Sequence, residues 1–531
     1  MLFTSYAFFG FTAALLVLYY LLPRRCQQPL LLVWSVLFYL SAGPKYILYI
    51  LLTALTVWLA GARMGENAKR ASAYLKGPGA DLSREEKKQY RERQKAVRRF
   101  WLAGCLVLNL GILAVVKYAG FAVANLNGLL TALGGTGALR GPDLVLPLGI
   151  SFYTFQAAGY LVDVYRGTAE AERNPLRVLL FLSFFPQLIQ GPISRFGDLS
   201  ATLYAPHPFD RQQVAFGLQR MLWGYFKKLV VADRLAPAVL AIVGDSETYR
   251  GAWAAVGMVF YTVQLYADFT GGIDVTIGLA QALGITVKEN FVRPYFSKSL
   301  KEYWRRWHIS MCSWFRDYLF YPLSTSPALR RFTRWTKARL GDRAGRRIPV
   351  YVSSFVVWFS TGLWHGASWN FICWGLLNYA VLMLSEELEP LYGKFHARFP
   401  GLGKRLWYRL FQAGRTFLLV CVLNLFDCYA TLGETAGALA SLFTAGNWSL
   451  LWDGSLLTLG LSGTDYGVLA FGCVLMLGVS LVQRSGCVRV RIARLPYWGR
   501  FALWYGLFLA VLLAGAYGVG YDASQFIYNR F

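Results

Sequence analysis

Long apolar stretches recur along the whole chain, and many reach or approach the roughly 20 residues that an α-helix needs to cross a bilayer. Clear examples cover residues 5–22, 45–61, 101–116, 416–430 and 466–482. Hydrophobic residues make up 56% of the 531-residue chain and charged residues only 15%, and no soluble stretch is long enough to bury a separate core. We therefore predict an all-α, polytopic membrane protein with about 10 to 12 transmembrane helices in one integral membrane domain over residues 1–531.

Basic residues lie in blocks between the apolar runs. Residues 63–99 hold 12 Lys or Arg against five acidic residues, and residues 330–347 hold eight against Asp342 alone. By the positive-inside rule both blocks are predicted to be cytoplasmic loops, so the net charge of +26 does not indicate a nucleic-acid partner. Arg24 and Arg25 follow the first apolar run, which predicts that the N-terminus lies outside the cytoplasm.

Glycine and proline interrupt many of the apolar runs. Backbone groups freed at membrane depth must be satisfied by protein or by water, so these breaks predict re-entrant or broken segments around an internal chamber. A transporter would share this feature. The interrupting residues include Pro147, Gly149, Pro186, Gly191, Gly271, Gly272, Gly362 and Gly366.

The chain has only four histidines, and its eight cysteines are scattered without a CxxC pair. We therefore predict no disulfide and no metal site. His207 lies in a proline-flanked polar turn and His396 lies in a basic loop, so solvated loop histidine is the better interpretation of both.

His365 lies near the middle of residues 349–384, a stretch of 36 residues without Asp, Glu, Lys or Arg. Ionisable groups at membrane depth are costly and usually functional, although a buried histidine that only donates to a backbone carbonyl remains the alternative. The flanking glycines are expected to leave room for a substrate, which Trp364, Ser368 and Asn370 would contact. A neutral imidazole here can accept a hydroxyl proton as a general base.

His308 lies in an aromatic and basic segment, residues 303–323, which predicts an interfacial or inward-dipping helix. At helical spacing, Trp304, His308, Cys312 and Phe315 would share one face. An aromatic and arginine anchor at the membrane surface is the alternative. In the functional interpretation this segment binds the acyl donor, through Arg305, Arg306, Trp307 and Ser310.

Asp268 and Asp274 flank Gly271 and Gly272, where we expect a break in the helix. Carboxylates beside such a break could line the internal chamber, so Asp268 is a further candidate for substrate binding. Hydrogen bonds between packed helices are the more common role of such residues.

Several ordered blocks of this sequence resemble the membrane-bound O-acyltransferase family. YWRRWHISMCSWFRDYLFYPL, at 303–323, is followed 57 residues after its histidine by GLWHGASW, which is similar to the paired signature of the bacterial branch. Further similar blocks are LPLGISFYTFQAAGYLVDVYRG at 146–167, FFPQLIQGPISRF at 184–196, YADFTGGIDVTIGLAQALGI at 266–285 and ENFVRPYFSKSL at 289–300. The resemblance covers about residues 1–385, and the helices of residues 386–531 match only in hydropathy.

The resemblance implies a helical bundle around a central funnel or tunnel, with His365 at the constriction and His308 as its companion. It implies an O-acyltransferase of the bacterial cytoplasmic membrane, similar to alginate and exopolysaccharide O-acetylases and to teichoic acid D-alanyl transfer proteins. No cofactor would be bound. The donor would be acetyl-CoA or an acyl carrier thioester on the cytoplasmic side.

The same resemblance implies the partners. These are membrane lipid, a polysaccharide acceptor and an extracytoplasmic protein that accepts or transfers the acyl group. Gly272 and Gln187 depart from the alginate enzymes, which usually have an aromatic residue and a histidine there. Two alternatives stay open, namely D-alanyl or other acyl transfer to teichoic-type polymers, and a transporter or flippase of a lipid-linked sugar.

Overall fold

The computed structural model describes residues 1–135, 139–142, 144–188 and 190–517, and within them the protein is all-helical, as predicted. The chain packs as two units. The first unit holds Ser5–Val214 and Ala280–Lys288, and the second holds Leu2–Thr4, Ala215–Leu279 and Glu289–Phe531. The prediction of one integral membrane domain, with a family-like core over residues 1–385, stays a prediction.

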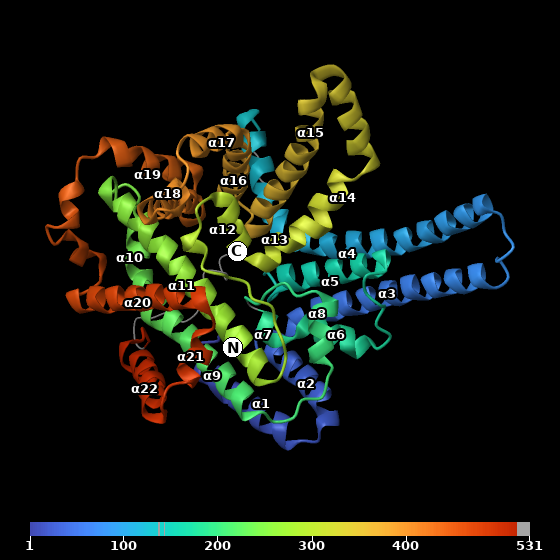
Figure 1. Ribbon diagram of the computed structural model, residues 1–531, viewed down its shortest axis with the longest axis horizontal. Helices are drawn as coiled ribbons and strands as arrows, with labels where there is room; N and C mark the ends of the chain where they lie inside the picture. Colours follow the sequence, from blue (N-terminus) through green and yellow to red (C-terminus); the bar gives the residue numbers. More distant parts are fainter. Residues whose placement is uncertain (136–138, 143, 189, 518–531) are drawn as a thin grey trace. The chain divides into compact units, whose positions relative to one another are not determined.

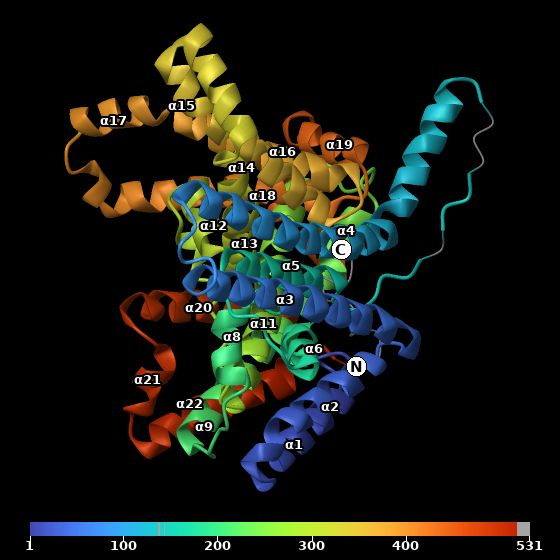
Figure 2. The same cartoon turned by 90° about the vertical axis from the view of Figure 1, so that its right-hand side faces the viewer.

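Two long helices of the first unit, α3 and α4, lie side by side with the shorter α5 (Figure 1, Figure 2). Gly61 of α3 permits this approach, because a Cβ there would lie 3.1 Å from the hydroxyl oxygen of Tyr160 in α5. The helices of this unit are α1 (Tyr6–Leu21), α2 (Gln27–Leu40), α3 (Ile47–Lys76), α4 (Arg84–Ala132), α5 (Ile150–Arg166), α6 (Pro175–Ser183), α7 (Phe185–Leu188) and α8 (Phe196–Leu203).

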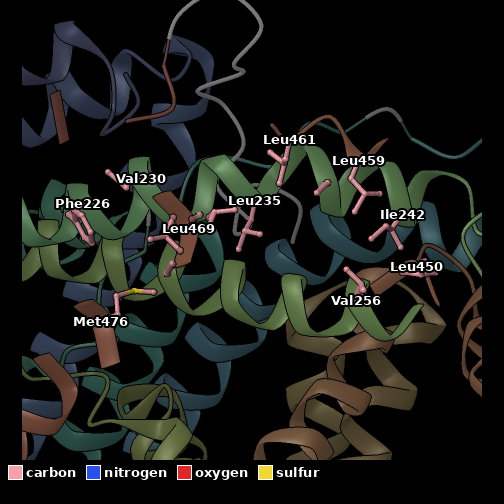
Figure 3. Packing of buried hydrophobic residues seen from close by; sticks show 14 of the residues in the cluster. Phe226, Val230, Leu235, Ile242, Val256, Leu450, Leu459, Leu461, Leu469 and Met476 are labelled. Atoms are coloured by element: carbon pink, nitrogen blue, oxygen red, sulfur yellow. The ribbon is translucent and has the colours of Figure 1, made fainter. Parts of the chain in front are cut away.

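The second unit carries the remaining α-helices and the π-helix η3 (Phe226–Ala232). The α-helices are α9 (Arg211–Tyr225, which begins in the first unit), α10 (Asp233–Gly244), α11 (Ala252–Ala282, whose last residues belong to the first unit), α12 (Leu300–Arg306), α13 (Ile309–Phe315), α14 (Tyr321–Ser324), α15 (Pro327–His365), α16 (Trp369–Glu387), α17 (Glu389–Arg398), α18 (Leu406–Cys428), α19 (Leu432–Thr444), α20 (Gly463–Val482), α21 (Val488–Ala493) and α22 (Tyr497–Ala514). Figure 3 shows the apolar core that η3, α10, α11 and α20 build, with Phe226, Ile242 and Met476 among its buried side chains.

Both basic blocks are largely helical, and only residues 77–83 of the first form an irregular turn, while their predicted cytoplasmic location stays a prediction. Helices α3 and α4 extend into residues 63–99, and Ser83 and Glu86 form a capping box that begins α4. The second block lies in α15, which reverses direction at Gly341, where φ is 84° (Figure 1). Charged residues at helical spacing extend these helices beyond their apolar parts, because Lys, Arg and Glu are strong helix formers.

Five of the described helices are long and apolar enough to cross a membrane. They are Pro44–Lys76, Arg84–Ala132, Leu406–Cys428, Gly463–Ser485 and Tyr497–Ala514, and the pair α16–α17, bent by 48°, would make a sixth. The predicted count of about 10 to 12 is therefore not confirmed. Several apolar runs fold instead into shorter helices, such as the 17-residue α5 and the 12-residue α10.

Helix α11 is continuous through Gly271 and Gly272, so the predicted break is wrong. Gly271 serves close packing. A Cβ on Gly224 of α9 would lie 2.6 Å from the carbonyl oxygen of Gly271, and a Cβ on Gly271 would lie 2.9 Å from that of Gly224. Glycine is required because the two backbones touch.

The backbone contact between Gly224 and Gly271 predicts that Gly224→Ala destabilises the protein. The added methyl group meets backbone atoms that cannot rotate away, so we expect the free energy of unfolding to fall by about 1–3 kcal/mol. Thermal unfolding of the purified protein in detergent measures it. Gly414→Ala in α18 is the matched control, because no atom lies within 4 Å of its added Cβ, and it should leave the melting temperature unchanged or slightly higher. Equal melting temperatures for both variants would contradict the close contact.

Candidate active site

His365 is the last residue of α15, and α16 begins four residues later at Trp369. The apolar run 349–384 is therefore two helices joined by a short turn, with His365 at the turn. Ser368 caps α16, since its hydroxyl accepts a hydrogen bond from the backbone N–H of Phe371. The imidazole lies 4.6 Å from the ring of Trp374 between centroids, in an edge-on arrangement.

The glycines around His365 bring α15 and α16 together. A Cβ on Gly362 would collide with the carbonyl oxygen of Phe371, and a Cβ on Gly366 would collide with its ring. Gly375 approaches Gly362 from α16, with 3.1 Å between its ideal Cβ and the Gly362 Cα. The expectation that Gly362 and Gly366 leave room for a substrate is therefore wrong, because α16 occupies that space.

His308 lies at a break between α12 and α13, so the prediction of one helix over residues 303–323 is wrong. Its backbone is left-handed, with φ 46° and ψ 52°, and its side chain is fully buried. A residue other than glycine in this region costs roughly 1–3 kcal/mol, and such strain concentrates at functional sites. The shared face that we predicted for Trp304, His308, Cys312 and Phe315 does not form, because the break changes the direction of the chain.

Asn290 fixes the position of His308. Its side-chain Nδ2 lies 3.3 Å from His308 Nδ1, and its Oδ1 accepts a hydrogen bond of 2.9 Å from the backbone N–H of Ser310. The backbone N–H of Ile309 donates to the carbonyl oxygen of Asn290 at 3.0 Å. Asn290 lies in the family-like block ENFVRPYFSKSL, but its place in the sequence predicts no role for it, because no spacing rule connects it with His308.

The indole of Trp364 contacts both imidazoles. Its ring centroid lies 6.0 Å from that of His308 and 5.1 Å from that of His365. Helix α15 thus carries one histidine and the aromatic ring that packs against the other. The structure brings His308, Trp364 and His365 into one aromatic cluster, and the catalytic role expected of the two histidines stays a prediction.

Trp307 supports this cluster from the end of α12. Its indole packs on Phe291 at 4.9 Å and on Phe269 at 6.0 Å, and Phe269 is itself 4.9 Å from the His308 ring. Burial among these rings lowers the pKa of His308 to about 3. His308 is therefore a neutral imidazole across the physiological pH range.

Other predicted site residues have contacts of their own. Asn370 is buried and donates to the carbonyl oxygen of Tyr429 at 2.7 Å, which connects α16 with the end of α18. Arg306 donates to Glu302 at 2.5 Å, and Arg305 is exposed. Ser310 contributes its backbone N–H to Asn290, as described above.

Asp268 lies in a buried chain of charges. Lys228 of η3 is 2.5 Å from Asp268 and 2.7 Å from Asp233, and its neighbour Lys227 is 2.6 Å from Asp274. Arg220 continues the chain, 2.8 Å from Asp274 and 2.6 Å from Glu289. In the structure Asp268 and Asp274 join α11 to α9 and η3 by ion pairs, instead of flanking a break.

The part of the chain that the structure describes contains no group of three or more His, Cys, Asp or Glu side chains arranged to hold a metal. The described cysteines are all free thiols.

Comparison with known proteins shows which family this chain is similar to. The profile of the membrane-bound O-acyltransferase family matches residues 172–334, a range that includes His308. The probable alginate O-acetylase AlgI of Azotobacter vinelandii is 35% identical over 393 residues, which cover 73% of this chain and 69% of the relative.

More distant relatives carry out related transfers. The peptidoglycan O-acetyltransferase of Helicobacter pylori is 31% identical over 59% of this chain and 60% of its own length. The teichoic acid D-alanyltransferase of Bacillus subtilis is 25% identical over 52% of this chain and 68% of its own length. These are the branches that the sequence blocks resemble.

Proposed function

This chain belongs to the membrane-bound O-acyltransferase family, and we propose that it moves an acyl group, in the simplest case acetyl, from a cytoplasmic thioester donor to a hydroxyl group outside the membrane. The chain is an O-acyltransferase and an integral membrane protein. The acceptor in this proposal is a polysaccharide, or a partner protein that passes the acyl group on.

The observation that carries the proposal is the pairing of His308 and His365 around Trp364. The two histidines come from separate segments, and one of them has strained backbone geometry. A buried aromatic site of this kind excludes water, which protects a thioester from hydrolysis. The relatives named above act, by their names, on alginate, peptidoglycan and teichoic acid.

In the proposed reaction His365 is the general base. It accepts the proton of the acceptor hydroxyl while the oxygen attacks the thioester carbonyl. The new C–O bond forms, the tetrahedral intermediate collapses, and the C–S bond breaks. The proton held by His365 then passes to the leaving thiolate, which departs as a thiol, so the enzyme returns to its starting state without a covalent intermediate.

The basic residues near His308 support the proposal that the acyl donor binds from the cytoplasmic side. Arg305 is exposed, Arg306 lies one residue further, and the basic block of residues 330–347 follows the His308 segment. Arginines bind phosphate groups strongly, so they suit acetyl-CoA or the phosphopantetheine arm of an acyl carrier. Under the positive-inside rule this side is the cytoplasm, and the acceptor approaches from the other side, in the bacterial cytoplasmic membrane with the N-terminus outside.

The test is transfer of label from radioactive acetyl-CoA in inside-out vesicles that contain the protein. Label on an extracytoplasmic polymer or protein, dependent on this chain, supports acetyl transfer across the membrane. Label that stays on the donor in the presence of acceptor polymer and of extracts containing partner proteins would overturn acetyl-CoA as the donor.

D-alanyl transfer to a teichoic-type polymer is the second candidate function. The similarity to a D-alanyltransferase over 52% of this chain favours it. Replacing labelled acetyl-CoA with a labelled D-alanyl carrier thioester in the same vesicles separates the two candidates. Family membership argues against the transporter or flippase considered from the sequence, because the relatives are transferases.

A further inference from the structure

Asn290 is fully buried and makes three hydrogen-bonding contacts at the break that holds His308. Two of them involve backbone groups, at Ile309 and Ser310. The third joins the two side chains. The contact with Ile309 is made by the backbone carbonyl oxygen of Asn290, and the contacts with Ser310 and His308 are made by its side-chain amide. These last two contacts give the amide one orientation, which has a chemical consequence for the imidazole.

The backbone N–H of Ser310 decides which end of the amide faces His308. A backbone N–H only donates, so the atom that it contacts at 2.9 Å is the carbonyl oxygen Oδ1 of Asn290. The NH2 group therefore faces Nδ1 of His308, 3.3 Å away. Because an amide NH2 only donates, Nδ1 is the acceptor, and the single proton of a neutral imidazole is then on Nε2.

The loop that carries Asn290 is held at the preceding residue as well. Glu289 receives two hydrogen bonds of 2.6 Å from the guanidinium of Arg220, which also donates to Asp274 of α11 at 2.8 Å. A bidentate arginine–carboxylate pair has a defined geometry, so it limits movement of the loop. Val292, two residues after Asn290, donates its N–H to the carbonyl oxygen of Arg306 at 2.9 Å.

We propose that Asn290 is a positioning residue that holds His308 in the tautomer with its proton on Nε2, so that His308 donates a hydrogen bond to the acyl carbonyl oxygen. This inference rests on the acyl transfer proposed above and divides the labour between the two histidines. His365 accepts the hydroxyl proton, and the Nε2–H of His308 stabilises the negative charge that develops on the carbonyl oxygen.

The surroundings of His308 fit a neutral donor. Its ring contacts Phe269 from α11, Phe291 from the loop and Trp364 from α15. These three side chains are uncharged, and burial disfavours the imidazolium form of His308. A donor that is already aligned and shielded from water stabilises an oxyanion without reorganisation at the moment of reaction.

Asn290→Asp tests the proposal, because the carboxyl group has the same shape and still accepts from Ser310. At low pH the pair formed by the new carboxyl group and His308 holds one proton more than a carboxylate beside a neutral imidazole. That proton lies either on the carboxyl group or on Nδ1 of His308, and in both states Nε2 of His308 keeps its own proton. As pH rises that proton is lost, the remaining ring proton turns to Nδ1 to face the carboxylate, and the Nε2–H donor disappears. We expect the kcat ratio of variant to wild type to fall by about 10-fold or more between pH 6 and pH 8.5.

Asn424→Asp is the matched control. Asn424 is also buried in the second unit, and its amide donates to the hydroxyl of Thr262 at 3.1 Å, which can donate to a carboxylate instead. Its kcat ratio to wild type should be independent of pH. A ratio for Asn290→Asp that is equally independent of pH would overturn the proposal, while a wild-type enzyme without acyl transfer would overturn the proposed function instead.

Substitution of His308 itself gives a second measurement if Asn290→Asp does not fold. The side-chain NH2 of glutamine takes the place of Nε2–H, whereas asparagine reaches only as far as Nδ1. We expect His308→Gln to retain at least 10-fold more activity than His308→Asn, since only the former keeps the proposed donor. The reverse order, or equal activities, would show that His308 does not act through Nε2–H.

Discussion

Replacing His365 with alanine is expected to lower kcat for acyl transfer by about 10²–10⁴-fold, because general base catalysis contributes this much to rate. The loss should appear in kcat more than in KM, since the proposed role of His365 is to move a proton and not to hold the donor. Initial rates of label transfer, measured in vesicles with matched amounts of protein, give both constants.

His396→Ala is the control for this experiment. His396 lies in α17 and is exposed, and its ring packs only at the surface, 5.9 Å from that of Tyr408. Its removal should leave acyl transfer within about two-fold of wild type, in keeping with the small effects of most surface substitutions. If His365→Ala keeps full activity while it folds normally, the histidine only packs α15 against α16, and the assigned base is wrong.

Replacing Lys228 with methionine is expected to destabilise the protein by about 3–5 kcal/mol, the usual cost of leaving buried charges without their counter-ion. The substitution leaves the carboxylates of Asp233 and Asp268 facing each other, 2.7 Å and 2.5 Å from the ammonium group that is lost. Asp268 is buried in the second unit, and Asp233 is mostly buried there. Thermal unfolding in detergent should show a large fall in melting temperature.

Lys301→Met provides the comparison for a surface pair. Lys301 lies 2.5 Å from Glu386, but both side chains are substantially exposed. An exposed ion pair contributes only about 0–1 kcal/mol, so this variant should melt close to wild type. If the two lysine substitutions had equal effects, the buried chain of charges would not be a stabilising element of the second unit.

Thermal unfolding of Lys228→Met also bears on two interpretations of Asp268. The sequence suggested a substrate-binding carboxylate beside a helix break, whereas the structure shows an ion pair within a continuous α11. Sequence patterns did not reveal this, because Lys228 lies 40 residues away and glycine pairs indicate both helix breaks and close helix packing.

What the sequence determined by itself is the class of protein, and it also singled out two histidines as candidates for the site. Apolar runs of membrane length and their basic flanks are local properties, so the all-helical membrane architecture followed from them directly. His365 was identified because it is the one ionisable group near the centre of a 36-residue uncharged run, and His308 because its segment resembles a family block.

Only the tertiary structure decided how those residues are placed relative to one another. The break at His308, the end of α15 at His365 and the indole of Trp364 against both rings depend on contacts between segments far apart in the chain. The role of Asn290 depends on which end of one amide meets one backbone N–H. No regular spacing of residues along the sequence reveals such contacts. They are determined by side-chain packing and by hydrogen-bond geometry in the folded chain.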